Sequence, residues 1–214
     1  MKIEIWSDVV CPWCYIGKRR LESALSQFEH ESEVSVTWRS FELNPSAPVR
    51  DSVPLEEMLA KKYGMNLDEA RAANARVTEL AAAEGLEYHL DQAHSANSFN
   101  AHRLIHLAAR HGLQGEMKER LMRAHFTEGI AVGESNLLIG LAKEVGLDGG
   151  ETRELLAGGL FAEEVRGDEA AARSHGISGV PFFLIEGKWG ISGAQPTEVF
   201  SQALEQLWGD LHPA

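Results

Sequence analysis

The sequence predicts an α/β protein, with a mixed β-sheet formed by the two ends of the chain and a large all-helical insertion between them. Three observations predict this fold class. Residues 2–41 read as strand, helix, strand. Residues 161–207 read as helix, strand, strand, helix, and the segment between reads almost entirely as helix. A β–α–β unit favours a parallel strand pair, and a closing hairpin can add antiparallel strands to the same sheet.

The first β–α–β unit is read from its periodicity. Residues 2–6, "KIEIW", alternate as a strand does. Leu21, Leu25 and Phe28 then recur at helical spacing, and Pro12 suits the first turn of a helix, where its missing N–H costs nothing. Residues 34–41, "VSVTWRSF", alternate again and predict a second strand.

The middle of the chain is helical in pattern. Three prolines in 45–54 end the first unit, and apolar stripes at helical spacing follow within residues 70–81, 101–108 and 137–145. We expect residues 53–158 to form a helical insertion domain. Residues 1–52 and 159–214 would then form one discontinuous α/β domain.

The last unit contains "SGVPFFLIEGKWG". Val180 and residues 182–185 predict a short apolar strand, "EGK" a tight turn and residues 189–191 the returning strand, before a final helix that starts at Pro196. Pro181 is ordinary as the first residue of a strand, since that position needs no N–H. The alternative is a cis Val180–Pro181 bond that turns the backbone beside Val180 towards the cysteines.

Composition excludes several classes of partner. The 214 residues contain 20 Lys and Arg against 32 Asp and Glu, a formal net charge of −12. Such a surface repels phosphate backbones and anionic lipids, so we expect neither nucleic acid nor membrane as a partner. Glu4 and Asp8 interrupt the N-terminal apolar residues, unlike a secretory signal. We therefore expect a cytoplasmic protein, as a monomer or homodimer.

The two cysteines of the chain, Cys11 and Cys14, lie between the first strand and the first helix. The N–H groups and dipole of a helix N-terminus favour an anion, so we expect a lowered pKa for the Cys11 thiol. Lys18 and the two arginines after it add positive charge. Cys14 lies one turn further on. The pair could then cycle between dithiol and disulfide, with Cys11 attacking a substrate disulfide and Cys14 resolving the mixed disulfide.

A close cysteine pair can also bind zinc or consist of two incidental buried thiols. A zinc site would need two more ligands, and the chain has no second cysteine pair. His102 and His106 share a helix face but lack an H-E-x-x-H context, so we expect no metal. The position of the two thiols between a strand and a helix favours redox chemistry over incidental burial.

Four segments carry a resemblance to a known family: "IWSDVVCPWCYIGKRRLE", "WRSFELNP", "NSFNAHRLIHLA" and "GISGVPFFLIEGKWGISGAQP". The chain resembles the DsbA-like branch of the thioredoxin superfamily, and within it the FrnE-like members, over nearly its whole length. The resemblance implies a thioredoxin-like fold and thiol–disulfide oxidoreductase activity on protein or small-molecule disulfides, without a bound metal or other cofactor. It also implies roles for Cys11 as nucleophile, Cys14 as resolving thiol and Pro181 as a cis-proline, with Pro12, Trp13 and Val180 contacting substrate.

The chain departs from the family pattern in two places. Strongly oxidising relatives carry a His between the cysteines, whereas this chain has Pro12 and Trp13, which puts strong oxidising power in doubt. Many thioredoxin-like proteins bury an acid six residues before the first cysteine, where this chain has Ile5. Asp8 or Glu42 could substitute for that acid, but we expect each to be an ordinary loop or strand-end carboxylate.

The architecture is also similar to 2-hydroxychromene-2-carboxylate isomerases and kappa-class glutathione transferases, which activate glutathione with a Ser in place of the first cysteine. By that similarity Asn97, Asn100 and His102 would face a small-ligand cleft, although Asn97 or Ser98 could simply cap a helix. Cys11 favours redox chemistry and leaves glutathione open as reductant or ligand. The alternatives are therefore a glutathione-dependent isomerase or transferase, and a non-enzymatic chaperone-like binding module.

Overall fold

The computed structural model describes residues 1–50 and 53–213. Its sheet contains β1 (Lys2–Ser7), β2 (Ser35–Ser40), β3 (Phe182–Ile185) and β4 (Trp189–Ser192), in the order β2-β1-β3-β4. β1 pairs with β2 in parallel, and the β1–β3 and β3–β4 pairs are antiparallel. The predicted mixed sheet from the two ends of the chain is therefore confirmed.

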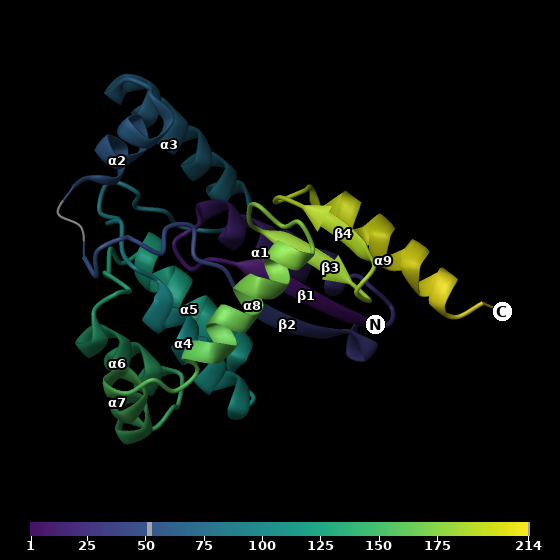
Figure 1. Cartoon of the computed structure of the whole chain (residues 1–214). Helices are drawn as coiled ribbons and strands as arrows, with labels where there is room; N and C mark the ends of the chain where they lie inside the picture. The colour runs from purple at the N-terminus through teal and green to yellow at the C-terminus, as the bar shows by residue number, and fades with distance from the viewer. Residues whose placement is uncertain (51–52, 214) are drawn as a thin grey trace.

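Helices cover both faces of the sheet (Figure 1). α1 (Pro12–Leu25) and α9 (Thr197–Leu211) pack together on one face, and α8 (Ala162–Ser174) lies against the other. The alternation within β1 explains this arrangement. Ile3 and Ile5 belong to the main core with residues of α1 and α9, whereas Trp6 packs in a separate cluster with Ala172 of α8.

The middle of the chain is helical, as expected. Its helices are α2 (Leu55–Tyr63), α3 (Leu67–Ala83), α4 (Phe99–Arg110), α5 (Gln114–Phe126), α6 (Ser135–Glu144) and α7 (Gly149–Ala157). The α2–α3 pair projects to one side, and α6 and α7 lie on the other side of α4 and α5 (Figure 1). In the described part of the chain, no helix is long and apolar enough to cross a membrane.

The stripes at 70–81, 101–108 and 137–145 lie in α3, α4 and α6, whereas α2, α5 and α7 are not individually evident from the sequence pattern. The main core joins residues of the sheet, α1 and α9 to residues of α4 to α7. The expected boundary between residues 52 and 53 falls partly outside the described residues. The division into an α/β domain and an insertion domain stays a prediction.

Candidate active site

The cysteine pair lies at the junction between β1 and α1. Cys11 is the N-cap of α1, Pro12 is its first residue, and the backbone N–H of Cys14 donates to the Cys11 carbonyl at 3.0 Å. Both cysteines are free thiols and both are buried, with Cys11 4% exposed and Cys14 1% exposed. The slightly greater exposure of Cys11 makes it the outer of the two sulfurs.

The loop before β3 faces the outer sulfur. The Val180–Pro181 bond is cis, and the Cys11 thiol donates to the Val180 carbonyl oxygen at 3.6 Å. α1 approaches this loop closely because it carries Gly17: a Cβ there would lie 3.1 Å from the Cγ atom of Pro181. The structure thus brings Cys11, Cys14, Val180 and Pro181 together from the two ends of the chain.

The interaction between the two thiols splits their acidities. The contact with the Cys14 side chain, followed by burial and the charge of the Cys14 sulfur, raises the pKa of the Cys11 thiol well above its ordinary value. Burial also raises the pKa of Cys14. The Cys11 side chain and the Lys118 charge are the largest of the effects that outweigh it, so the pKa of Cys14 is lowered. When the pair loses its first proton, the negative charge therefore resides on the Cys14 sulfur.

The expected lowering of the Cys11 pKa is thus wrong for the reduced pair. The N–H of Cys14 at the helix N-terminus does lower the pKa of Cys11. The interaction with the Cys14 side chain and burial oppose that effect more strongly, and the carboxylate of Asp8 adds a smaller opposing effect. Interacting sites of this kind titrate as a pair, and the proton on Cys11 is exchangeable with Cys14.

A buried carboxylate lies under the cysteine loop. Asp8 is fully buried, its Oδ2 accepts from the Leu43 N–H at 2.8 Å, and its Oδ1 lies 3.3 Å from Nε2 of His102. Burial raises the pKa of Asp8, but the His102 ring and the Leu43 N–H lower it by a larger amount. The net pKa of Asp8 is therefore lowered, and the carboxylate stays ionised. Asp8 is thus a fixed negative charge close to the reacting sulfurs, not an ordinary loop residue.

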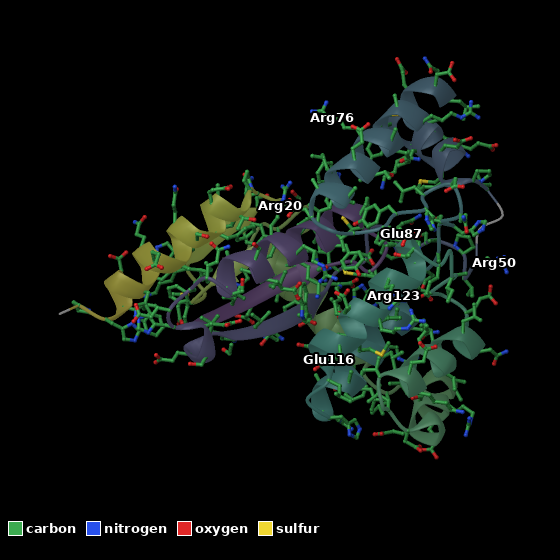
Figure 2. All side chains as sticks on the ribbon, turned by 180° about the vertical axis from the view of Figure 1, so that it is seen from behind. Arg20, Arg50, Arg76, Glu87, Glu116 and Arg123 are labelled. Atoms are coloured by element: carbon green, nitrogen blue, oxygen red, sulfur yellow. The ribbon has the colours of Figure 1, made fainter. Side chains whose placement is uncertain are left out.

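The outer surroundings of the pair are aromatic. The Tyr88 hydroxyl donates to the Pro12 carbonyl at 2.7 Å, and the Tyr88 ring stacks on Phe126 of α5 with centroids 4.8 Å apart. Trp13, between the two cysteines in the sequence, is 40% exposed. Arg20 bonds Glu84 just beyond α3 at 2.6 Å, and Figure 2 labels it at this junction.

The residues expected to face a small-ligand cleft are engaged in contacts within the fold. The Asn97 side chain donates to the Pro45 carbonyl at 3.1 Å and accepts from the Phe99 N–H at the start of α4, close to the alternative capping role. Asn100 accepts from Arg103 at 2.9 Å. His102 is buried against Asp8. Their role in ligand binding stays a prediction.

The two histidines that share a face of α4 have different partners. His102 Nε2 faces Asp8, whereas His106 Nε2 lies 3.1 Å from Asp168 and 3.1 Å from the Ser40 hydroxyl. Within residues 1–50 and 53–213, no group of three or more His, Cys, Asp or Glu side chains could hold a metal ion. The polar groups near the cysteines are therefore arranged as ion pairs and hydrogen bonds.

Lys118 is a site residue that the sequence pattern did not single out. It lies on α5, is 1% exposed, and its charge acts on both sulfurs. The signal in the sequence is its spacing: Lys118, Met122 and His125 recur at i, i+4 and i+7, so Lys118 occupies the buried stripe of an amphipathic helix. A lysine in that position must have an electrostatic partner.

A family model described as "DSBA-like thioredoxin domain" matches residues 2–205. Among solved structures, a probable DsbA oxidoreductase of Streptomyces coelicolor is 44% identical, with a TM-score of 0.95, covering 100% of this chain and 92% of the other. This match includes the helical insertion as well as the sheet.

Two more distant structures share the fold. The cytosolic disulfide reductase DsbM of Pseudomonas aeruginosa, solved with GSH, is 20% identical with a TM-score of 0.69, covering 97% of this chain and 99% of the other. A 2-hydroxychromene-2-carboxylate isomerase is 15% identical with a TM-score of 0.74, covering 99% of this chain and 98% of the other. At these identities the likeness concerns the fold alone.

Proposed function

The chain belongs to the family of DSBA-like thioredoxin domains, and we propose that it is a thiol–disulfide oxidoreductase in which Cys11 attacks and Cys14 resolves. One observation carries the proposal. Two free thiols lie three residues apart at the N-terminus of α1, each shifts the pKa of the other, and the S–H of Cys11 donates to the carbonyl before Pro181. Two sulfurs in that relation can form and break a disulfide without large backbone movement.

The chemistry needs no group beyond the two thiols and the substrate. Proton exchange with Cys14 leaves a thiolate on Cys11, which attacks one sulfur of a substrate disulfide. The Cys11–substrate bond forms, the substrate S–S bond breaks, and the other substrate sulfur leaves as a thiolate. The Cys14 thiol gives its proton to the substrate thiolate that has left, and the resulting Cys14 thiolate attacks Sγ of Cys11 and releases the second substrate sulfur as a thiolate. The protein loses two electrons and the substrate gains them.

Position explains why Cys11 takes the attacking role. Cys11 is the more exposed of the two residues, its S–H donates to the Val180 carbonyl, and the next residue but one, Trp13, is exposed. An extended peptide could bond the backbone of Val180 while its disulfide approaches Cys11. We include Pro12, Trp13 and Val180 in the proposal as the surface that contacts substrate.

A thiol must return the protein to its reduced form, and we propose glutathione for this step. Two molecules of a monothiol would be consumed per cycle, first forming a mixed disulfide and then releasing glutathione disulfide. The DsbM structure with GSH supports this choice, and its description as a cytosolic reductase supports a cytoplasmic, reducing role for this chain. Pro12 and Trp13 between the cysteines agree with a weak oxidant.

Insulin reduction tests the proposal. The wild-type protein should catalyse it in the presence of glutathione, and Cys11→Ser should lose the activity. Cys14→Ser is the matched variant: it should also stop turnover but accumulate a disulfide between Cys11 and substrate or glutathione, visible by mass spectrometry. Trapping on Cys14 in the Cys11→Ser protein would reverse the assigned roles. Full activity without either cysteine would exclude redox catalysis.

The same variants separate the proposal from the isomerase or transferase alternative. Those enzymes use a Ser hydroxyl where this chain has Cys11, so Cys11→Ser should preserve or improve a glutathione-dependent isomerisation. Loss of insulin reduction together with gain of isomerisation would show that this fold supports both chemistries and that residue 11 selects between them.

A further inference from the structure

Lys118 is a buried lysine without a matched carboxylate. Its Nζ donates to the Ser7 carbonyl at 3.1 Å and lies 5.5 Å from the centre of the Trp38 ring. Among residues 1–50 and 53–213, no carboxylate oxygen lies within the 4.0 Å of an ion pair with this Nζ. A buried ammonium is costly unless nearby charges compensate for its lost hydration. Its position therefore points to a partner that is charged only part of the time.

The contact between Lys118 and Ser7 shows where that partner must lie. Ser7 ends β1, directly before Asp8 and four residues before Cys11, so the ammonium lies at the base of the cysteine loop. Burial lowers the pKa of Lys118 to about 8, the charges of Cys14, Asp8 and Cys11 raise it, and Lys18 lowers it. Asp8 is already bonded to the Leu43 N–H and lies 3.3 Å from His102. The sulfur of Cys14 is the remaining anion.

We propose that Lys118 is a positioning residue whose ammonium stabilises the Cys14 thiolate while Cys11 is bonded to substrate. The inference rests on the proposed oxidoreductase function and concerns its second step. In the free dithiol, the Cys11 S–H stabilises the Cys14 thiolate. Once Cys11 has formed a mixed disulfide, it has no S–H to offer, and Cys14 is still buried. The Lys118 charge then remains to favour the anion that must attack.

The same charge should affect the redox equilibrium. A group that stabilises a thiolate stabilises the reduced protein and makes the disulfide easier to reduce. α5 of the insertion would in this way supply a charge that the β1–α1 loop lacks. Asp8 acts in the opposite sense on Cys11, so the two buried charges together hold the negative charge on the inner sulfur.

The decisive measurement is the pKa of Cys14 in a Cys11→Ser background, where the Cys11 thiol cannot contribute. Thiolate absorbance or alkylation rate should give a Cys14 pKa about one unit higher, a tenfold smaller ratio of thiolate to thiol, when Lys118→Met is added. Lys118→Arg is the matched control. It keeps the charge and should keep most of the shift. An equal Cys14 pKa with and without Lys118→Met, or the same rise in Lys118→Arg as in Lys118→Met, would overturn the proposal.

A second measurement titrates the unsubstituted chain and uses a variant only to assign one signal. Charge coupling is reciprocal, so the Cys14 thiolate must raise the pKa of Lys118. Nitrogen-15 NMR of the lysine side chains, with the Lys118 signal identified by its loss in Lys118→Arg, should show a higher pKa in the reduced protein than in the disulfide form. An unchanged Lys118 pKa would contradict the inference. Neither measurement uses a substrate, so both can succeed while insulin reduction fails, or the reverse.

Discussion

The inserted helices form two unlike groups around the cysteine pair. α2 has no buried residue, and α3 buries only Ala70 and Ala81. α4 and α5, which have 12 and 13 residues, each bury seven residues, and four of those fourteen can carry charge: His102, Arg103, Lys118 and His125. The first group is a surface arm. The second belongs to the same core as the sheet and carries the polar groups that act on the sulfurs.

The arm touches the site only at its base. Ala81, with Val77 and Leu80 beside it, packs into the cluster that contains both cysteines. The outer part of α3 is exposed, and Figure 2 shows Arg76 pointing away from the body of the molecule. The contrast teaches that an insertion can serve a site in two ways. One part packs beside the sulfurs, and another part carries a buried charge that shifts their pKa values.

The largest difference is expected for stability. Leu121 of α5 is fully buried in the main core, so Leu121→Ala should lower the free energy of unfolding by about 3 kcal/mol, from lost apolar burial and an unfilled cavity. Leu67 of α3 is 41% exposed, and Leu67→Ala should cost under about 1 kcal/mol. Urea unfolding of the two variants measures both. Equal losses would mean that the arm is as deeply integrated as α5.

The fold was predictable because the local patterns are strong. Alternation in residues 2–6 and 34–41 and the "EGK" turn correspond to β1, β2 and the β3–β4 hairpin, where Glu186 and Gly187 adopt positive φ values of 51° and 66°. α5 is not evident as a separate helix because Lys118 and His125 interrupt its apolar stripe. One of the residues that obscure the pattern, Lys118, is a residue whose charge acts on the Cys14 sulfur.

The cysteine pair was predictable from spacing, but its electrostatics were not. Local sequence suggests that a helix N-terminus acidifies Cys11, and that effect is present. The larger effects are burial and the interaction of the two thiols with each other. Lys118, which is 104 residues away from Cys14 in the chain, comes next at Cys14, and Asp8, which has the sequence context of an ordinary loop carboxylate, adds a smaller effect at Cys11. Nothing in a single sequence indicates which inserted helix approaches the sulfurs.

The second prediction concerns pH. Burial lowers the pKa of His125 on α5 to about 4, against an ordinary value of 6.5. His125 is neutral in both the folded and the unfolded protein at pH values above 6.5. As the pH falls from 6.5 towards 4, the unfolded chain binds a proton that the folded protein excludes, and stability is lost. His125→Gln should remove about 2 kcal/mol of the loss measured by urea unfolding between pH 7 and pH 4.5.

α2 and α3 contain no histidine, so they cannot contribute to that acid-dependent loss. The ionised Asp8 affects the free energy of unfolding in a lower pH range. Its pKa lies below the ordinary value, so its contribution is complete above the unfolded pKa near 3.8 and is lost as pH falls through the folded value. If wild type and His125→Gln lose equal stability between pH 7 and pH 4.5, then the folded protein binds a proton at His125 as readily as the unfolded chain.

The smallest effect is expected on the arm itself. The Asn66 side chain accepts from the Glu69 N–H at 2.9 Å, and the Glu69 carboxylate accepts from the Asn66 N–H at 2.8 Å, which closes a capping box at the start of α3. Asn66→Ala should destabilise that helix end by about 1 kcal/mol, seen as faster amide hydrogen exchange in its first turn. Asp148→Ala, at the cap of α7, is the matched change elsewhere in the insertion. Insulin reduction should stay at the wild-type rate in Asn66→Ala, because only the other end of α3 meets the cysteine cluster. A fall in that rate would show that the whole arm, not its base alone, takes part in substrate contact.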